Sequence, residues 1–160
     1  MADRYFVGTG NWDSSDTSVW SDTSGGTTGF SIPTSTDDVF IDANSGTVTI
    51  MNTAICHDIT FTGFTSTLAG TSNLDVYGSL LLVSGMTLTF SGDVTFKSTS
   101  TGETVTTGGK TITFDTIFNG SGGEWTLQDA FSATGSQRFI DLQAGSLVTC
   151  LLYTSDAADE

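Results

Sequence analysis

A three-residue pattern of an apolar residue, a threonine and a second apolar residue recurs along the chain and restricts how it can fold. Four copies are clear: Ile59-Thr60-Phe61, Leu88-Thr89-Phe90, Val94-Thr95-Phe96 and Ile112-Thr113-Phe114. Successive side chains of a strand point to opposite faces, so each copy is expected to bury its apolar ends and expose its threonine. No segment shows a sustained helical period. The pattern therefore predicts an all-β protein with these eight apolar residues in its core.

Similar strands and turns return at a spacing of about 20 residues, which indicates stacked units whose faces are buried only by their neighbours. Segments that begin at the following residues align: Thr53, Asn73, Asp93, Thr111 and Ser132. In this alignment five glycines fall near one corner: Gly63, Gly85, Gly102, Gly122 and Gly145. The spacing favours a right-handed parallel β-solenoid (β-helix) over residues 37–149. An antiparallel β-sandwich or jelly roll stays open as an alternative, because it also gives short strands at regular spacing.

The composition excludes several other classes of protein. With 14% charged residues, the chain lacks the Glu, Lys and Arg that a helical bundle needs, and 37% hydrophobic residues argue against disorder. Four Lys and Arg residues in a chain of net charge -14 leave no basic surface for nucleic acid. No apolar run reaches the roughly 18 residues of a membrane span. We therefore expect no nucleic-acid partner and no membrane insertion.

Residues 1–36 differ from the repeated part, because they carry large aromatic side chains separated by Asp, Ser and Gly. The aromatic residues are Tyr5, Phe6, Trp12, Trp20 and Phe30. A solenoid needs a cap, since an open apolar end is a template for aggregation. The segment is predicted to be an N-terminal aromatic cap. The alternative is that Trp12 and Trp20 form a platform on which a glycan stacks.

Several segments resemble one family. Arg4-Tyr5-Phe6-Val7, Asn11-Trp12, Ser18-Val19-Trp20, Ile32-Pro33-Thr34 and residues 37–42 look like the opening of β-helical structural proteins of tailed phages and bacterial surface adhesins. Residues 74–80 and 85–89 resemble their coils. The resemblance implies a non-enzymatic structural or adhesive module, located on a virion or an extracellular surface. Its partners would be virion or surface-fibre subunits, further copies of this chain, or a host-surface glycan.

The last eleven residues, 150–160, resemble the translated adapter of a transposase-based sequencing library. The resemblance implies that a metagenomic reading frame ran into the adapter, and that the tail was never selected to pack. On this interpretation the solenoid is truncated after Thr149, Cys56 is the only natural cysteine, and no intramolecular disulfide can form. We expect an exposed C-terminus from Ser155 onward, next to an uncapped apolar coil.

Residues that could carry chemistry are few, and we assign no catalytic, cofactor-binding or metal-binding residue from the sequence. His57 is the only histidine, and its neighbour Cys56 should point to the opposite face of the strand. Asp37-Asp38 could pair as in β-helical glycosidases, but hydrogen bonds to turn amides are favoured. Residues 42–46 and 13–16 place oxygen ligands as calcium sites do, and equally as Asx turns do. A fragment of a polysaccharide depolymerase and a glycan-binding module remain the alternative functions.

Overall fold

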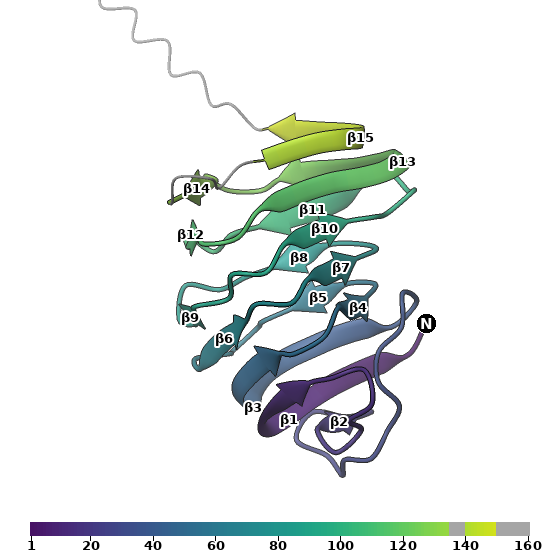
Figure 1. Cartoon of the computed structure of the whole chain (residues 1–160), viewed down its shortest axis with the longest axis vertical. Coiled ribbons are helices and arrows are strands. Elements are labelled where there is room, and N and C mark those ends of the chain that lie inside the picture. The colour runs from purple at the N-terminus through teal and green to yellow at the C-terminus, as the bar shows by residue number, and fades with distance from the viewer. Residues whose placement is uncertain (135–139, 150–160) are drawn as a thin grey trace, which may run out of the picture.

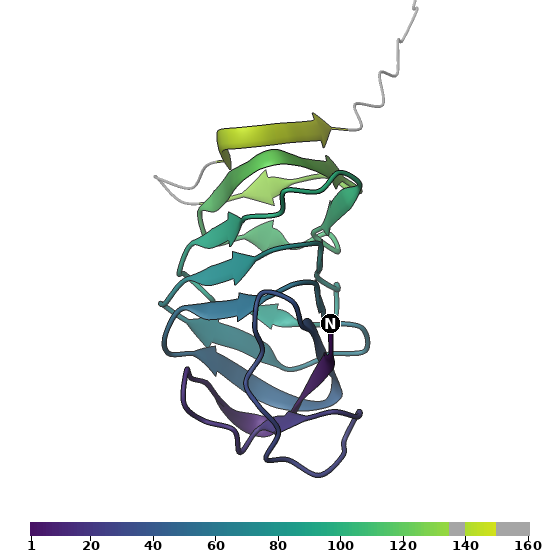
Figure 2. The same cartoon turned by 90° about the vertical axis from the view of Figure 1, so that its right-hand side faces the viewer.

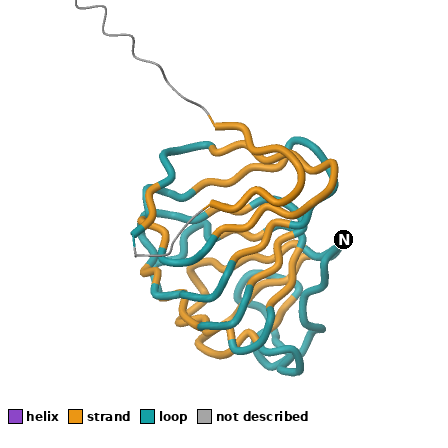
Figure 3. Tube along the Cα trace, turned by 45° about the horizontal axis from the view of Figure 1, so that its top comes forward, coloured by secondary structure: helices purple, strands orange, loops and turns teal. Residues whose placement is uncertain are grey.

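The computed structural model describes residues 1–134 and 140–149 and shows a parallel β-solenoid of about five turns. Its coils stack from the N-terminal segment at one end to the last strand at the other (Figure 1). Among the described residues the secondary structure consists of strands and loops, as the tube in Figure 3 shows. The described part of the chain holds no helix with the length and hydropathy of a membrane span.

The strands are short except where one strand bends around a corner and serves two sides of the solenoid. Their bounds are β1 Asp3–Trp12, β2 Trp20–Ser21, β3 Asp38–Ile50, β4 Ala54–Cys56, β5 Ile59–Thr60, β6 Thr67–Gly70, β7 Leu74–Val76 and β8 Leu80–Leu81. They continue with β9 Thr87–Leu88, β10 Val94–Phe96, β11 Glu103–Thr106, β12 Thr111–Ile112, β13 Thr116–Leu127, β14 Ser132–Ala133 and β15 Ile140–Thr149.

The ladders group the strands into three faces. Figure 2 shows the stacked strands from a second side. The first face contains β4, β7, β10 and the beginnings of β13 and β15. The second face contains the beginnings of β1 and β3, then β5, β8, β11 and the ends of β13 and β15. The third contains the ends of β1 and β3 with β6 and β9. Every ladder between described strands is parallel except β1 with β2, so the antiparallel sandwich is excluded.

The core lies inside these faces and follows the apolar alternation of the sequence. In β4, β7 and β10 the two outer residues are buried and the middle one is partly exposed. Seven of the eight predicted core residues are buried: Ile59, Phe61, Phe90, Val94, Phe96, Ile112 and Phe114. The eighth, Leu88, packs against the core but stays partly exposed. Its strand, β9, pairs with β6 on one side, and no described strand pairs with β9 on the other side. The predicted core is confirmed for these seven residues.

The threonines of the repeated pattern face outward but are less exposed than the sequence suggests. Thr60, Thr95 and Thr113 are half-buried, and Thr89 is exposed. Neighbouring parallel strands lie about 4.8 Å away on each side, so they cover much of a short outward side chain. Thr113 also donates its hydroxyl to the carbonyl oxygen of Phe90 in the coil below, at 2.8 Å. Thr89 likewise donates to the carbonyl oxygen of Leu68 at 3.3 Å, so these two threonines join coils as well as facing outward.

The register predicted from the sequence is right for three coils and wrong for the next two. Ala54, Leu74 and Val94 are aligned, as the segments beginning at Thr53, Asn73 and Asp93 require. Val94 is aligned with Thr116, 22 positions later, and Thr116 is aligned with Ile140, 24 positions later. Thr111 and Ser132 pair with each other instead, in the two-stranded sheet of β12 and β14. These two coils are longer because the loops between their strands contain extra residues. Longer loops cost little free energy, so the stacked strands keep their pairing.

The five glycines expected at one corner occupy two different corners. Gly63 and Gly85 lie between the second and third faces, where β5 leads to β6 and β8 leads to β9. Gly102, Gly122 and Gly145 lie between the first and second faces. The longer coils shift the positions in sequence at which the chain turns, so a spacing of about 20 residues between glycines does not correspond to one corner.

The N-terminal segment closes one end of the core with aromatic rings, as predicted, but its boundary differs. Phe6, Trp12 and Trp20 are buried, and each of the first two contacts Trp20 edge-on at 5.3 and 5.0 Å. β1 pairs in parallel with β3 and so belongs to the solenoid, which begins inside the expected cap. Tyr5 faces outward, and Phe30 is 38% exposed. The irregular part of the cap is the segment between β1 and β3.

The last described coil is formed by β15, which pairs with β13 through both of its halves. Its outward and inward side chains are exposed more than those of earlier coils, with Ile140, Leu142 and Val148 at 39%, 49% and 43%. β15, the last described coil, therefore carries exposed apolar side chains, and the prediction that the solenoid is truncated after it stays a prediction. The adapter-like segment 150–160, with the predicted exposure from Ser155 onward, lies outside the described residues.

Replacing Phe96 by alanine should destabilise the fold by about 3–5 kcal/mol, because the ring is fully buried and stacks on Phe118 at 4.8 Å. The half-buried neighbour Thr95, changed to alanine, is the control and should cost less than about 1 kcal/mol. Urea unfolding of the two variants measures the difference. Equal losses would show that the inward alternation does not determine stability.

Two glycines with ordinary backbone angles give a second test of coil packing. A Cβ at Gly92 would collide with the carbonyl oxygen of Ser72 in the coil below, whereas at Gly85 its nearest neighbour is 3.6 Å away. Gly92→Ala should therefore lower the unfolding free energy by roughly 1–3 kcal/mol. Gly85→Ala should leave it within about 1 kcal/mol of the wild type. A neutral Gly92→Ala would contradict the close approach of these coils.

Candidate functional site

The outward side of the second face carries a row of aligned side chains near its N-terminal end. Tyr5 is aligned with Phe40, Phe40 with Thr60, and Thr60 with Leu81. Each of these four side chains is half-buried. The row begins with two aromatic rings and continues with a hydroxyl and an aliphatic side chain. Parallel pairing without a shift places these residues together although they are distant in the sequence.

The two aromatic rings of this row stack face to face beside a groove. The ring centroids of Tyr5 and Phe40 are 4.7 Å apart and their planes differ by 16°. The groove has a volume of about 450 Å³ and is lined by Phe40, Asp42, Thr60 and Thr62. It thus combines an aromatic ring, two hydroxyl groups and one carboxylate, a mixture of apolar and polar groups typical of small-ligand sites.

The electrostatic setting of this groove is acidic. Partial burial, together with the negative charges of Asp3 and Asp42, raises the pKa of Tyr5 above its ordinary value. The phenol is therefore neutral at physiological pH and can both donate and accept a hydrogen bond. A ligand in this groove meets a carboxylate and hydroxyl groups.

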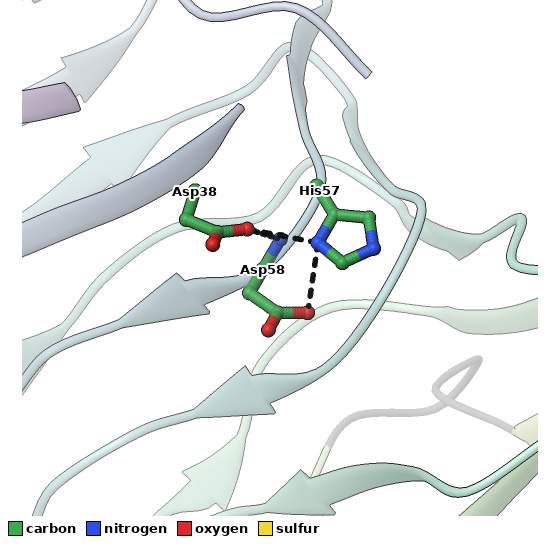
Figure 4. A group of neighbouring side chains, drawn as sticks. All are labelled: Asp38, His57 and Asp58. Carbon is green, nitrogen blue, oxygen red and sulfur yellow. Dashed lines mark hydrogen bonds and ion pairs between the residues drawn. The ribbon is translucent and has the colours of Figure 1, made fainter. Parts of the chain in front are cut away.

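A second group of polar side chains lies at the edge of the same face, where the chain turns from β4 to β5. His57 Nδ1 is 2.8 Å from Asp38 Oδ1 and 3.4 Å from Asp58 Oδ1, as drawn in Figure 4. One ligand-capable atom of each residue lies within 4.8 Å of the other two. The side chains are 26%, 18% and 45% exposed for His57, Asp38 and Asp58. Within the described residues this is the one such cluster of three or more His, Cys, Asp or Glu side chains.

Backbone amides of two coils hold the carboxylates of this cluster in place. The amide of Asp58 donates to Asp38 Oδ1 at 3.3 Å, and the amide of Ser79 donates to Asp58 Oδ1 at 2.7 Å. Gly78 lies against the same carboxylate, and a Cβ there would collide with Asp58 Oδ1. The absence of a side chain at residue 78 therefore leaves the space that the Asp58 carboxylate occupies.

Burial and neighbouring negative charges both raise the pKa of the ionisable groups at this turn. Burial is the main cause that raises the pKa of Asp58, and the charges of Asp38 and Glu103 add to it, against the Ser79 hydrogen bond and His57. Burial also raises the pKa of the Cys56 thiol well above its ordinary value. Cys56 is fully buried while His57 lies outside, so the prediction that these neighbours point to opposite faces is confirmed.

Asp37, the neighbour of Asp38, holds the chain before β3 through hydrogen bonds. Its carboxylate accepts hydrogen bonds from the amide of Ala2 at 3.0 Å, and from the amide and hydroxyl of Thr34 at 3.1 and 2.7 Å. Burial opposes ionisation, but these hydrogen bonds and the charge of Arg4 together lower the pKa of Asp37. Asp37 therefore fixes the chain entering β3, as expected, and it does not pair with Asp38.

The two loops that could have been calcium sites are Asx turns. Asp42 accepts the amide of Asn44 at 2.8 Å, Asp13 accepts that of Ser15 at 2.9 Å, and Asp16 accepts that of Ser18 at 2.8 Å. These carboxylates bond to amides two residues further along, which is the arrangement that stabilises such turns.

The tryptophan platform suggested by the sequence is not present. Trp12 and Trp20 are 3% and 0% exposed and contact each other at the end of the core, so neither ring offers a face to a glycan. Tyr5 and Phe40 form an outward-facing, half-buried aromatic pair that the sequence analysis missed. The signal that could have found it is the register between β1 and β3, and separate strands do not reveal their register in sequence.

Comparison with models of protein families, with curated proteins and with solved structures finds no match for this chain.

Proposed function

We propose that this chain is a non-enzymatic structural and adhesive module of a phage fibre or bacterial surface appendage, and that it binds a neutral glycan on its second face. The observation that carries the proposal is the aligned Tyr5–Phe40 pair beside the groove lined by Asp42, Thr60 and Thr62. On this proposal the protein is located on a virion or an extracellular surface.

The architecture supports a structural role. Each coil pairs with the next through parallel ladders, and inward apolar side chains form one continuous core along the stack. Such stacking gives an extended body whose outward faces vary without disturbing the core. A body of this kind presents a binding surface at a fixed distance and orientation, which is what an adhesive fibre requires.

The groove supports glycan binding by its chemistry. A sugar ring presents aliphatic C–H groups on its faces and hydroxyl groups at its edges. The exposed part of the Phe40–Tyr5 stack can pack against the C–H groups of the sugar. Asp42, Thr60 and Thr62 offer hydrogen-bond partners to its hydroxyl groups. The net charge of -14 disfavours an acidic polysaccharide, because like charges repel on approach. A neutral glycan is therefore the favoured ligand class.

The carboxylates favour binding over hydrolysis. Glycoside hydrolysis uses two carboxyl groups about 5–9.5 Å apart on either side of the scissile bond. Among the described residues that line the groove, Asp42 is the one carboxylate. The pair Asp37-Asp38, which suggested an enzyme in the sequence, is divided between the Thr34 turn and the His57 cluster.

Phe40→Ala should weaken binding of neutral glycans on an array by about tenfold or more, since loss of an aromatic contact of about 1.5 kcal/mol corresponds to that factor. Ile117→Ala is the control: this half-buried side chain lies on the first face, aligned with Thr95 and outside the groove. Its binding should match that of the wild type, and Asp42→Asn should weaken binding like Phe40→Ala.

Two results would contradict the proposal. The first is equal glycan binding by the Phe40→Ala and Ile117→Ala variants, which would remove the groove as the binding site. The second is release of reducing ends from a bound polysaccharide, which would make the protein a depolymerase. Capsid and tail genes beside the reading frame on its original contig are expected for a phage fibre.

A further inference from the structure

We propose that Asp38, His57 and Asp58 bind a divalent first-row transition-metal ion such as Zn²⁺ at the turn between β4 and β5. The ligands would be one imidazole nitrogen, His57 Nδ1, and one oxygen from each carboxylate. The proposal concerns an ion site and is independent of the glycan groove.

The three candidate ligand atoms all lie within 4.8 Å of one another. Zinc binds nitrogen and oxygen ligands at about 2.0–2.2 Å, so ligand atoms around one ion lie roughly 3–3.5 Å apart. The observed separations from His57 Nδ1 to the two carboxylate oxygens are 2.8 and 3.4 Å. Figure 4 shows Nδ1 turned toward both carboxylates, so an ion could take the place between them with small movements of the side chains.

The carboxylates are held by the fold and not only by each other. Asp38 and Asp58 occupy equivalent positions on neighbouring coils, directly before the aligned pair Val39 and Ile59 of β3 and β5. The Ser79 amide orients the Asp58 carboxylate, and Gly78 leaves the space for it. Such outer contacts fix ligand orientation in metal sites and raise the affinity for the ion.

The charge of the site favours a cation. Two carboxylates stand beside each other on neighbouring coils, and a single imidazole contacts both. The ammonium group of Lys97 pairs with Asp75, which lies on the first face. A divalent ion would neutralise the two adjacent negative charges. An imidazole nitrogen among the ligands favours zinc and its neighbours over Ca²⁺ and Mg²⁺, which prefer oxygen ligands alone.

The partial exposure of the three side chains leaves room for water as a further ligand. His57 is 26% exposed and Asp58 is 45% exposed. Three protein ligands with a remaining water position form an open site. Because Asp38 belongs to one coil and His57 and Asp58 to the next, the bound ion would link two coils near the N-terminal end.

Titration of the whole protein with Co²⁺, a spectroscopic substitute for Zn²⁺, tests this assignment. We expect visible d–d absorption that saturates at one ion per chain and disappears when Zn²⁺ is added. Asp38→Asn and His57→Gln should each weaken binding by at least about tenfold. Asp22→Asn, which removes an exposed carboxylate in the cap, is the charge-matched control and should bind as the wild type does.

The wild-type titration decides the question even where a variant folds poorly. Absence of saturable d–d absorption would overturn the proposal, and would mean that His57 only pairs with the two carboxylates. Absorption that persists unchanged in Asp38→Asn and His57→Gln would also overturn it, since it would come from ligands elsewhere in the chain that these variants keep. A Zn²⁺-dependent rise in melting temperature that the wild type and Asp22→Asn share, and the two ligand variants lack, would support it.

Discussion

Parallel pairing of successive coils in register is the constraint on which the rest of this structure depends. It sets neighbouring strands about 4.8 Å apart, so equivalent side chains of consecutive coils meet at that distance. Inside, Phe96 stacks on Phe118 at 4.8 Å, with planes 10° apart. Outside, Tyr5 stacks on Phe40 at 4.7 Å and 16°. The same geometry therefore builds the core and the proposed adhesive surface.

The same pairing also brings together groups that would otherwise avoid each other. Asp38 and Asp58 precede aligned residues of β3 and β5, so their carboxylates lie side by side on neighbouring coils. Like charges in this position destabilise a sheet unless a positive group compensates them. His57 contacts both, and the Ser79 amide bonds to one. The acidic turn is thus a consequence of stacking, and two adjacent carboxylates that share one imidazole make it a candidate ion site.

Much of the fold was predictable because alternation is a local property of the chain. The apolar–threonine–apolar pattern identified seven core residues between Ile59 and Phe114, and Cys56 and His57 were placed on opposite sides correctly. The expected alignment of Thr111 and Ser132 with Asp93 was wrong, because the coils after Val94 lengthen. Trp12 and Trp20, suggested as a glycan platform, are buried in the cap. Aromatic composition alone does not distinguish a ring that closes a core from one that faces a ligand.

By itself the sequence determined that this chain forms outward-threonine, inward-apolar strands that stack, since side-chain direction in a strand depends only on position along it. The tertiary structure alone decided which residues meet across coils. Tyr5 and Phe40 are 35 positions apart, and Asp38 and His57 are 19 apart. Their contacts depend on the length of each loop between strands. The length of a loop decides which residue of the next strand reaches a given row, and a one-residue slip of register moves each side chain to the other face. No local pattern encodes that length, so both candidate sites became visible only when the coils were stacked.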